Sequence, residues 1–500
     1  MISRVKYIGV LILKKQNIEK SIKKNVIWNG ILSLSTIIFP FVTFPYITRV
    51  LGVEVNGAIN FSLSTVNYFS LFATLGLSTY GVKACACVKD SREELSKVVQ
   101  ELLIISGIAA VIVLGVLYLA AWFIPQLSSY SIYLTVFSLN IIFNVFGINW
   151  MYQGIEKYEY VTTRSIIFKI ISIVMMFMFV KKPEDGIIYA AISVFASVGG
   201  NILNIIYSRR FISYKKIKKK YEFKRHMSPI LVLFATNLAV NVYSNLDSVM
   251  LGLLCGDYPT GIYYVAVKIK TILITLISSF SIVIMSRLSY VNKNSNINEL
   301  QRVLKKSYSV IIFITISVSV YFILLSKESI LFLSGSDYLE AITPMRILMP
   351  TLIFSSLSQI LGSQYSVSVG KEKNLMKAVI IGAVVNIVMN LLLIPKFSYN
   401  GAAIGTLIAE ITQCLIQMIL AKDIVKKVFS IKKLIYVLFS TTISAIGFIL
   451  SYKLYSSFSA FIVLVVSAIL FFSIYSIILI LLKYDLCVEV LEILKKIKKG

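Results

Sequence analysis

Several ionisable side chains lie inside long apolar stretches of the sequence, and these residues have the clearest chemical potential. Two of them are acids, Asp247 and Glu410, which we predict to be ion-coupling residues. A lone carboxylate in apolar surroundings is protonated, paired with a cation or turned towards a wet cavity. The alternatives are a structural ion pair for Glu410 and hydrogen bonding between helices for Asp247.

Basic and amide side chains in the same stretches predict a cationic cavity. Lys268 shares one helical face with Tyr264, Thr271, Thr275 and Ser279, because these positions are three or four residues apart. That face should look onto water or a ligand rather than lipid, and a surplus of cations favours an anionic ligand such as a diphosphate. The residues predicted to line this cavity are Lys268, Lys270, Arg346, Asn241 and Asn245.

Each of these cavity residues has a plainer alternative role. Lys270 can extend towards the membrane interface along its own aliphatic stem, and Arg346 can anchor the start of its helix. Asn241 and Asn245 continue a stripe that begins at Asn237, with a spacing of four residues. Amides in such a stripe also hold neighbouring helices together.

Membrane-spanning helices must position these side chains, because the composition leaves little room for a soluble fold. Of the 500 residues, 57% are hydrophobic. About fourteen stretches of roughly 18 or more largely apolar residues can each cross a hydrocarbon core of about 30 Å. The first two spans are predicted at 26–47 and 58–80, and the eleventh and twelfth at 376–395 and 400–421. The predicted fold class is an all-α polytopic membrane protein.

The distribution of charge predicts the orientation of the chain. The sequence has 50 Lys and Arg against 23 Asp and Glu, which gives a formal net charge of +27. Most of the basic residues fall in alternate gaps between the apolar spans, and short cytoplasmic loops are the ones enriched in Lys and Arg. Both termini are therefore predicted to be cytoplasmic. We expect no nucleic-acid partner, because no folded polar domain gathers the positive charge.

The gaps between spans also divide the chain into regions. A basic amino-terminal segment, 1–25, is expected to lie in the membrane interface near anionic lipids. The basic linker 208–228 is the longest interior gap and separates six predicted spans from eight, and His226 near its end is expected to be solvated. The other predicted regions are an amino-terminal lobe at 26–207, a carboxy-terminal lobe at 229–421, two further spans at 434–482 and a basic cytoplasmic tail at 483–500.

The two lobes contain a short repeated pattern. The dipeptide Leu-Gly at 51–52 is followed by Gly57, and the same dipeptide at 251–252 is followed by Gly261. Both patterns come directly after an odd-numbered predicted span. Parallel repeats of this kind are typical of transporter folds whose lobes are related by an axis along the membrane normal.

Motifs for enzyme chemistry are absent from the sequence. It contains no P-loop, no H-E-x-x-H and no nucleophile elbow. The five cysteines are an odd number without metal-ligand spacing, so we expect neither a disulfide framework nor a metal site. We also expect no cofactor and no enzymatic activity, because the loops are too short to build a catalytic domain.

One block of the sequence is similar to a known family. The run FPYITRVLG at 44–52, followed by Gly57, Phe61, Ser62 and LGLSTYG at 75–81, resembles the amino-terminal signature of Wzx-type oligosaccharide flippases. These are polysaccharide exporters of the MATE-related MOP superfamily. The resemblance implies two six-helix lobes plus two carboxy-terminal helices. It also implies alternating-access transport of undecaprenyl-diphosphate-linked oligosaccharide across a bacterial cytoplasmic membrane, coupled to a proton or sodium gradient.

The resemblance further implies a cationic cavity, to which Arg49 within the shared block would contribute. The alternative for Arg49 is a role in the fold, capping helix carbonyls. The implied partners are the lipid-linked oligosaccharide, anionic membrane lipids and polysaccharide polymerase or assembly proteins of the capsule or O-antigen type. The alternative functions are a multidrug exporter of the MATE type, a flippase for the peptidoglycan lipid precursor and a membrane polysaccharide polymerase.

Overall fold

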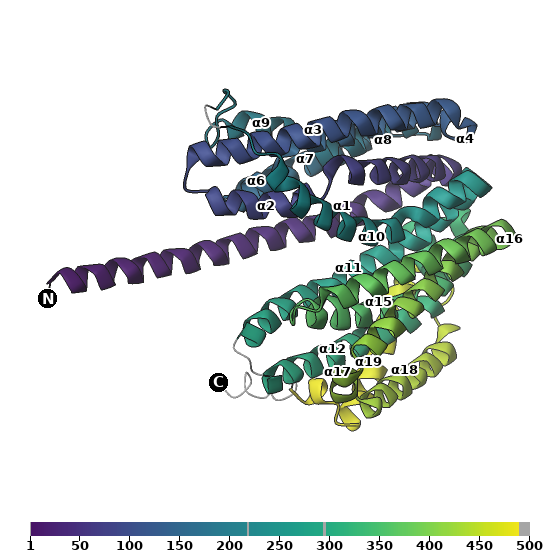
Figure 1. Cartoon of the computed structure of the whole chain (residues 1–500). Helices are drawn as coiled ribbons and strands as arrows, with labels where there is room; N and C mark the ends of the chain where they lie inside the picture. Colours follow the sequence, from purple (N-terminus) through teal and green to yellow (C-terminus); the bar gives the residue numbers. More distant parts are fainter. Residues whose placement is uncertain (1, 218–219, 294–296, 490–500) are drawn as a thin grey trace. The chain divides into compact units, whose positions relative to one another are not determined.

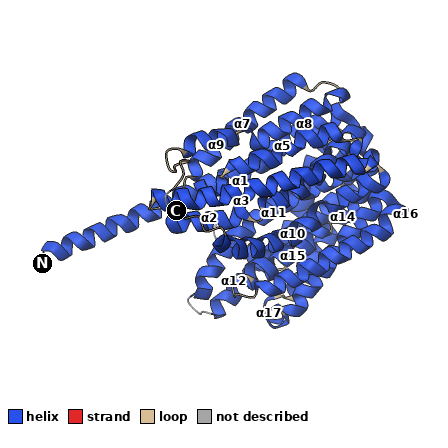
Figure 2. Ribbon diagram, turned by 45° about the horizontal axis from the view of Figure 1, so that its top comes forward, coloured by secondary structure: helices blue, strands red, loops and turns tan. Residues whose placement is uncertain are grey.

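The structure is a computed structural model, and it describes the backbone of residues 2–217, 220–293 and 297–489. At some further positions the structure describes the backbone but not the side chain. These positions are 2–27, 29, 37, 235–237, 239–245, 279–293 and 297. Within the described ranges every regular element is a helix, as Figure 2 shows, and no strand occurs. The predicted all-α fold class is confirmed.

The chain forms two compact units, and each combines segments that are distant in sequence. Unit 1 comprises residues 1–43 and 62–238, and unit 2 comprises residues 44–61 and 239–500. The boundaries fall within helices α1 (Ile2–Thr74) and α10 (Lys224–Cys255), so each of these helices contributes to both units.

Both units contain long helices together with short ones (Figure 1). The remaining elements of unit 1 are α2 (Leu77–Val88), α3 (Arg92–Phe123), α4 (Pro125–Ser128), α5 (Ser131–Gly147), α6 (Asn149–Gly154), α7 (Tyr158–Phe179), η1 (Pro183–Asp185), α8 (Gly186–Val194), η2 (Phe195–Gly199) and α9 (Asn201–Ser208). The remaining elements of unit 2 are α11 (Asp257–Lys293), α12 (Ile297–Leu324), α13 (Ser326–Leu333), η3 (Ser336–Ala341), α14 (Ile342–Leu348), α15 (Thr351–Gln359), η4 (Ile360–Ser366), α16 (Glu372–Leu420), α17 (Lys422–Val428), α18 (Ile431–Tyr452) and α19 (Ala460–Leu481).

Ten helices in the described part of the chain are long and apolar enough to cross a membrane, and a bent pair, Ser336–Leu348 with Thr351–Ser366, is an eleventh candidate. A helix needs about 20 residues to cross the hydrocarbon core. Two of the ten, Gly30–Val88 and Glu372–Leu420, have 59 and 49 residues and are therefore long enough to cross twice. The chain is a polytopic membrane protein, and the count of fourteen spans stays a prediction.

The helix α16 is a hairpin of two antiparallel segments. Its backbone leaves the helical region at Ser398, where φ is 51° and ψ is −130°. A methyl group on Gly401 would lie 2.3 Å from the Leu393 carbonyl oxygen, and one on Gly405 would lie 2.4 Å from the Asn390 side-chain oxygen. The two segments therefore run side by side, and they correspond to the eleventh and twelfth predicted spans.

The helix α18 shows the pattern of burial expected of a protein in lipid. Its buried face includes Ser440, Thr441 and Ser444, whereas Leu450 is exposed. Large apolar side chains of a soluble protein are more often buried than hydroxyl side chains. In lipid, apolar side chains that face outwards carry no hydrophobic free-energy penalty, because the lipid tails are apolar too. Small hydroxyl residues on the inner face allow neighbouring helices to pack closely.

The break in α1 is stabilised by side chains of unit 2. At Gly52 the backbone has a φ of 72°, which a residue with a Cβ rarely adopts. The Gly52 carbonyl oxygen accepts hydrogen bonds from Asn56 Nδ2 at 2.7 Å and from Tyr338 Oη at 2.8 Å. The Thr48 hydroxyl donates to the Leu333 carbonyl oxygen at 3.2 Å. This segment of α1 is therefore bound to α13 and η3.

The repeated glycines noted in the sequence meet in unit 2. A methyl group on Gly57 would lie 1.9 Å from the Asp257 carbonyl oxygen, and one on Gly261 would lie 2.1 Å from the Val53 carbonyl oxygen. Gly252 takes part as well, since a methyl group there would lie 2.1 Å from an aromatic carbon of α1. The backbones of α1 and α11 therefore touch at a crossing that only glycine permits.

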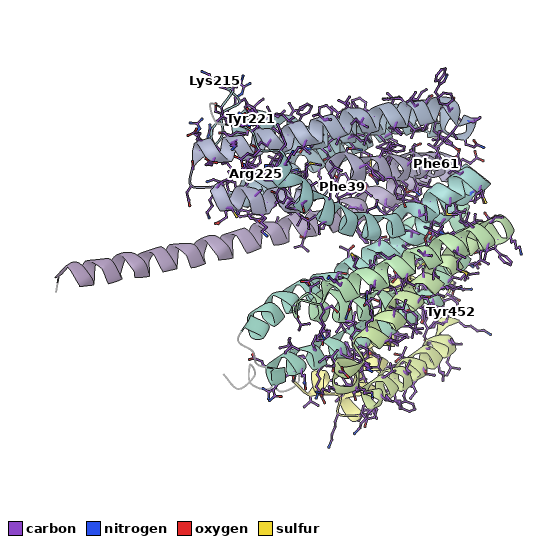
Figure 3. All side chains as sticks on the ribbon, viewed as in Figure 1. Phe39, Phe61, Lys215, Tyr221, Arg225 and Tyr452 are labelled. Carbon is purple, nitrogen blue, oxygen red and sulfur yellow. The ribbon has the colours of Figure 1, made fainter. Side chains whose placement is uncertain are left out.

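The linker is bound to unit 1 by a buried polar network. The carboxylate of Glu101 on α3 is buried and accepts a hydrogen bond from Arg225 at 2.7 Å. His226 Nε2 lies 2.8 Å from the same carboxylate, and His226 Nδ1 lies 2.7 Å from Tyr80 Oη. His226 is 2% exposed, so the expectation of a solvated histidine is wrong. Arg225 and Tyr221, which donates to α3 from the linker, are labelled in Figure 3.

The same end of α3 binds the linker at two further points. Gln100 Nε2 donates to the carbonyl oxygens of Ser213 at 2.6 Å and Lys215 at 3.1 Å. The Lys97 ammonium lies 2.7 Å from Glu222 and holds the pKa of that carboxyl below its usual value. The stabilisation from this pair is complete above the unfolded pKa and is lost as the pH falls through the lower, folded pKa.

Replacing Gly261 with alanine should destabilise unit 2, because the new methyl group would collide with the Val53 carbonyl oxygen. Overpacking of this kind typically costs about 1–3 kcal/mol. The measurement is the loss of helical circular dichroism on heating the purified protein in detergent, with Gly107→Ala as the matched control. Gly107 lies in α3 with no atom within 4 Å of a new methyl group, so alanine there should be neutral or stabilising. Equal Tm values for the two variants would contradict the close contact.

Candidate functional site

The carboxylate of Asp247 is the centre of a hydrogen-bond network that joins α10, α11 and α16. Asp247 is 7% exposed. Its Oδ2 accepts hydrogen bonds from Tyr263 Oη on α11 at 2.6 Å and from Thr406 Oγ1 on α16. Its Oδ1 accepts from Asn390 Nδ2 at 2.6 Å and from Asn386 Nδ2 at 3.1 Å. Four side-chain donors from two helices therefore converge on one buried carboxylate.

The hairpin of α16 explains why these donors converge. Asn386 and Asn390 are four residues apart and therefore share a face of the first segment. The reversal at Ser398 returns the chain, so that Thr406 of the second segment also reaches the carboxylate. Among the described residues nothing donates to Asn390 Oδ1, which is buried.

The network combines one carboxylate with neutral oxygen atoms. The described part of the chain contains no cluster of three or more His, Cys, Asp or Glu that could hold a metal ion. A single carboxylate with amide and hydroxyl oxygens is instead suited to a hard monovalent cation or a proton. The hydrogen bonding between helices given as the alternative for Asp247 is observed, and its role as an ion-coupling residue stays a prediction.

The partners of Asp247 were only partly accessible from the sequence. The amides Asn386 and Asn390 stand out by their spacing, whereas neither Tyr263 nor Thr406 carries a signal that would connect it with Asp247. The side chains of Asn241 and Asn245, on α10, lie outside the described residues. Their predicted place in the cavity stays a prediction.

Lys270 of α11 and Glu410 of α16 form an ion pair. Lys270 Nζ lies 3.8 Å from Glu410 Oε1, and the two side chains are 15% and 7% exposed. This geometry matches the structural alternative for Glu410, and it gives Lys270 a partner within unit 2 rather than at the interface. Breaking such a pair is costly, because the remaining partner becomes an uncompensated buried charge.

Lys268 differs from its neighbour, because no carboxylate pairs with it in the part of the chain that the structure describes. Its Nζ lies 5.9 Å from the centre of the Tyr264 ring, which is within the range of a cation–π interaction. The polar stripe continues through Thr271 and Thr275, whose hydroxyls donate to carbonyl oxygens one turn earlier. The opposite face of α11 packs into the core of unit 2. Within the stripe, Tyr264 also packs against that core, whereas Thr271 is exposed, so the stripe runs from the core to the surface.

Arg49 caps the carboxyl end of α13. Its guanidinium donates to the carbonyl oxygens of Leu331 at 3.1 Å and Phe332 at 2.5 Å, and to that of Pro45 at 2.7 Å. The last carbonyls of a helix have no partner inside it and carry the negative end of the dipole, so a guanidinium is favourable there. The capping role given as the alternative for Arg49 is observed, and its role in binding substrate stays a prediction.

Arg346 lies at the other end of the same short helix. Its Nε donates to the hydroxyl of Ser326, the first residue of α13, at 2.8 Å. The side chain of Arg346 is exposed. Arginines therefore bind both ends of α13, and the contact of Arg346 corresponds to the anchoring alternative.

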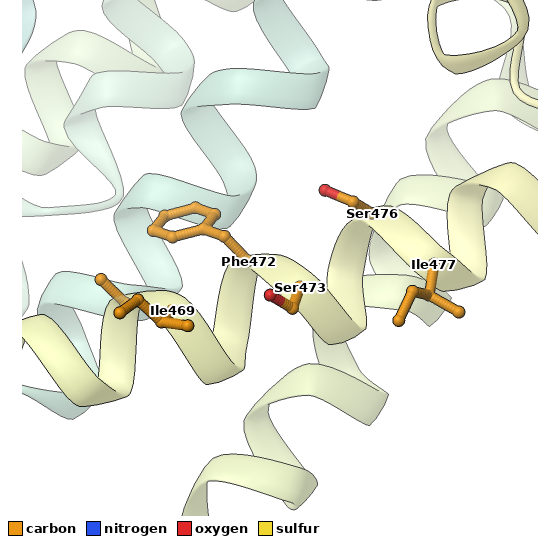
Figure 4. A pocket seen from close by; sticks show the side chains of 6 residues that line it. Ile469, Phe472, Ser473, Ser476 and Ile477 are labelled. Carbon is orange, nitrogen blue, oxygen red and sulfur yellow. The ribbon is translucent and has the colours of Figure 1, made fainter. Parts of the chain in front are cut away.

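A groove of about 630 Å³ runs along α19 (Figure 4). Isoleucine, phenylalanine and serine side chains line it, and those labelled in Figure 4 are Ile469, Phe472, Ser473, Ser476 and Ile477. None of the predicted site residues contributes to this groove. Because the lining of this groove is uncharged, the groove lacks the cationic groups of the anion site expected from the sequence.

Lys270 and Glu410 should show strong coupling in a double-mutant cycle built from Lys270→Met and Glu410→Gln. Breaking a buried ion pair by removing one partner costs about 3–5 kcal/mol, and the double variant should recover part of this loss. Thermal unfolding in detergent measures the coupling, for which residues in contact give about 0.5–3 kcal/mol.

The exposed pair of Lys306 and Glu489 is the matched control for this cycle. Its atoms are 2.5 Å apart, and the side chains are 61% and 51% exposed. Because water screens such a pair, its coupling should be about 1 kcal/mol or less. Additive losses at Lys270 and Glu410 would show that these two residues do not interact.

The chain is similar to transporters in sequence and in fold. A protein of Escherichia coli (strain K12) named "Putative O-antigen transporter" is 25% identical over 400 residues, which are 79% of this chain and 95% of that protein. The solved structure "Lipid II flippase MurJ, inward closed conformation" has a TM-score of 0.70 at 20% identity, covering 92% of this chain and 99% of that chain. An inward-facing multidrug resistance MATE transporter of the MOP superfamily has a TM-score of 0.60 at 15% identity, covering 79% of this chain and 100% of that chain.

Two family models match the sequence. The MatE model matches residues 233–392. The model described as polysaccharide biosynthesis protein matches residues 22–289, which include the FPYITRVLG block at 44–52. Because this second match covers more than half of the 500 residues, the chain belongs to the polysaccharide biosynthesis protein family.

Proposed function

We propose that this protein is a flippase for undecaprenyl-diphosphate-linked oligosaccharide repeat units in the assembly of surface polysaccharide of the capsule or O-antigen type. Membership of the polysaccharide biosynthesis family is the observation that carries the proposal. The relative from Escherichia coli supports it, because its name is that of an O-antigen transporter. The named relatives are transporters rather than enzymes.

A flippase for the peptidoglycan lipid precursor is the second candidate. The likeness to the lipid II flippase, with a TM-score of 0.70, favours it. At 20% identity this likeness concerns the fold alone. The family model and the O-antigen relative therefore rank the oligosaccharide substrate first.

In this proposal Asp247 binds the coupling cation, which is a proton or a sodium ion. The buried carboxylate and the free oxygen of Asn390 support this role. The hydroxyls of Tyr263 and Thr406 can rotate to present a lone pair instead of a proton. Because Asp247 joins three helices, occupation of the site changes how α10, α11 and α16 are held together. Such a difference in binding free energy between two conformations is what alternating access requires.

The cations of the proposed substrate site differ in whether they already bind another group of the protein. Lys268 is proposed to meet the diphosphate, because its ammonium lies on the polar face of α11 without a carboxylate partner in the described residues. Three other cations already bind protein groups, and each would have to exchange its partner to reach a substrate: Arg49, Lys270 and Arg346. Once Lys270 binds the substrate instead of Glu410, the Glu410 carboxylate would be able to take up a proton.

The proposal includes a location in the cytoplasmic membrane with both termini in the cytoplasm. The basic gaps between the apolar spans support this orientation. Anionic lipids would surround the basic loops, and polysaccharide polymerase or assembly proteins would receive the oligosaccharide on the outer leaflet.

The deciding experiment follows lipid-linked intermediates in a strain that lacks the gene. Complete repeat units should accumulate on the cytoplasmic leaflet, and surface polysaccharide should be lost. Single units that reach the outer leaflet without being polymerised would indicate a polymerase instead. Unchanged intermediates with normal surface polysaccharide would refute the proposal in favour of the peptidoglycan precursor or a drug substrate.

In the same strain, Asp247→Asn should fail to restore export. The substitution keeps the size of the side chain but removes the negative charge that a cation needs. At matched protein levels we expect export to fall at least about tenfold, which corresponds to a change of about 1.4 kcal/mol. Asp485→Asn is the control, since Asp485 is an exposed acid that pairs with Lys433. Full export by the Asp247 variant would exclude this residue as the coupling site.

A further inference from the structure

Unit 1 contains a cavity with a mixed polar and apolar lining, and none of the residues of the proposed ion and diphosphate sites contributes to it. Its volume is about 230 Å³, Trp150 supplies an aromatic surface, and Leu77 and Val145 complete the apolar part of the lining. The polar part of the lining is neutral and consists of Thr74, Ser78, Ser106, Asn144, Asn149 and Gln153. Ser78 and Asn144 are exposed, whereas Ser106 is buried, so the cavity leads from the surface of unit 1 into its interior.

The cavity lies where two helices are broken. Between α1 and α2 the chain passes through Leu75 and Gly76 with φ of 47° and 73°, and between α5 and α6 it passes through Ile148 with φ of 36°. This left-handed conformation is rare for residues with a Cβ and least favourable for a β-branched side chain. Strained backbone clusters at functional sites. The two breaks therefore mark the cavity as a built site.

The amide of Asn149 is held in a defined orientation. Its Oδ1 accepts hydrogen bonds from Arg164 at 3.1 Å and from Asn204 Nδ2 at 3.0 Å. Its Nδ2 is therefore the atom that is available to donate into the cavity. Arg164 is buried and also donates to the Gly200 carbonyl oxygen at 3.1 Å. A guanidinium fixed directly behind Asn149 makes the cavity unfavourable for a cation.

The indole ring of Trp150 is fixed by the close approach of α6 to α2, which lie side by side in Figure 1. A methyl group on Gly81 would lie 2.6 Å from ring atoms of Trp150. One on Gly154 would lie 2.8 Å from Cys85 Cβ. The two glycines allow the helices to touch, and this contact holds a flat apolar surface at the wall of the cavity.

The chemistry of the lining selects the ligand. A hydroxyl group both donates and accepts hydrogen bonds, and its complement is a mixture of amides and hydroxyls. An anion would call for cationic donors and a cation for carboxylates, and neither lines the cavity. The volume is below the roughly 300–1,000 Å³ of sites that enclose a drug-sized molecule. The cavity therefore fits one small, uncharged ring that carries several hydroxyl groups.

We infer that this cavity is a subsite for one sugar residue of the transported saccharide, bound by Asn144, Asn149 and Gln153 and packed against Trp150. The inference rests on the proposed function for the kind of saccharide that reaches the protein. It assigns sugar recognition to unit 1, whereas the network of Asp247 belongs to unit 2.

The test uses the fluorescence of Trp150 in the full-length protein. The sequence has three tryptophans, so Trp28→Phe together with Trp122→Phe leaves Trp150 as the reporter. The purified protein is titrated in detergent with the repeat-unit saccharide released by mild acid from the surface polysaccharide of the host. A separate titration uses undecaprenyl phosphate as a probe for the lipid alone. The saccharide should give a saturable change in Trp150 emission, and the lipid should give none.

Two variants in the same background test the polar contacts. Asn144→Ala and Gln153→Ala should each raise the half-saturating saccharide concentration about 2- to 10-fold, as expected for the loss of one hydrogen bond. Asn144 is exposed and makes no hydrogen bond through its side chain within the described residues, so its replacement should leave the fold intact. Thr135→Ala on α5 is the control, because Thr135 is exposed, lies outside the cavity and donates to the Ser131 carbonyl oxygen. This control should bind like the background protein.

The inference is overturned if the saccharide leaves Trp150 emission unchanged, or if both cavity variants bind it as tightly as the control does. Neither result affects the proposed function, which depends on where lipid-linked units accumulate in the deletion strain. Saccharide binding that weakens in the variants supports the subsite. If the deletion strain then shows unchanged intermediates, the sugar site stands and the flippase proposal falls.

Discussion

A polar group inside an apolar span has no water to bind, so its partners must come from the protein itself. Asp247 meets this requirement with four donors from α11 and α16. In the gap between the first two predicted spans, the Gly52 carbonyl oxygen accepts from Asn56 and Tyr338, and the exposed guanidinium of Arg49 donates to helix carbonyls. In each case a helix ends, bends or reverses near the polar group. The positions of the helix breaks are therefore tied to the positions of the polar chemistry.

Regular helices and interrupted helices therefore have different roles in this protein. The regular spans α18 and α19 turn apolar side chains outwards and carry none of the predicted site residues. The interrupted helices carry the chemistry: the reversal at Ser398 completes the surroundings of Asp247, and the breaks at Leu75 and Ile148 border the neutral cavity of unit 1. Each unit thus presents a different kind of site, one with a carboxylate and one with uncharged amides and hydroxyls.

The cations predicted to line the substrate cavity are less available than their number in the sequence suggests. Arg49 and Arg346 bind the two ends of α13, and Lys270 is paired with Glu410. Lys268 lies over the Tyr264 ring and has no carboxylate partner among the described residues. Because an engaged cation has to exchange one partner for another before it binds a substrate, substrate binding and internal contacts compete. Such competition is a physical way to couple a ligand to a conformational change.

Long apolar runs, the charges of the gaps and the FPYITRVLG block are local properties, and from them the sequence by itself determined the helical membrane fold and the family. It also identified Asp247 as a polar residue in an apolar span. The tertiary structure decided which residues surround it, because Thr406 reaches that carboxylate only after a chain reversal. His226 was misjudged for the same reason: its neighbours in sequence are basic and polar, and its partner Glu101 lies 125 residues away. The orientation of Asn149 likewise depends on contacts that span helices, which no local pattern encodes.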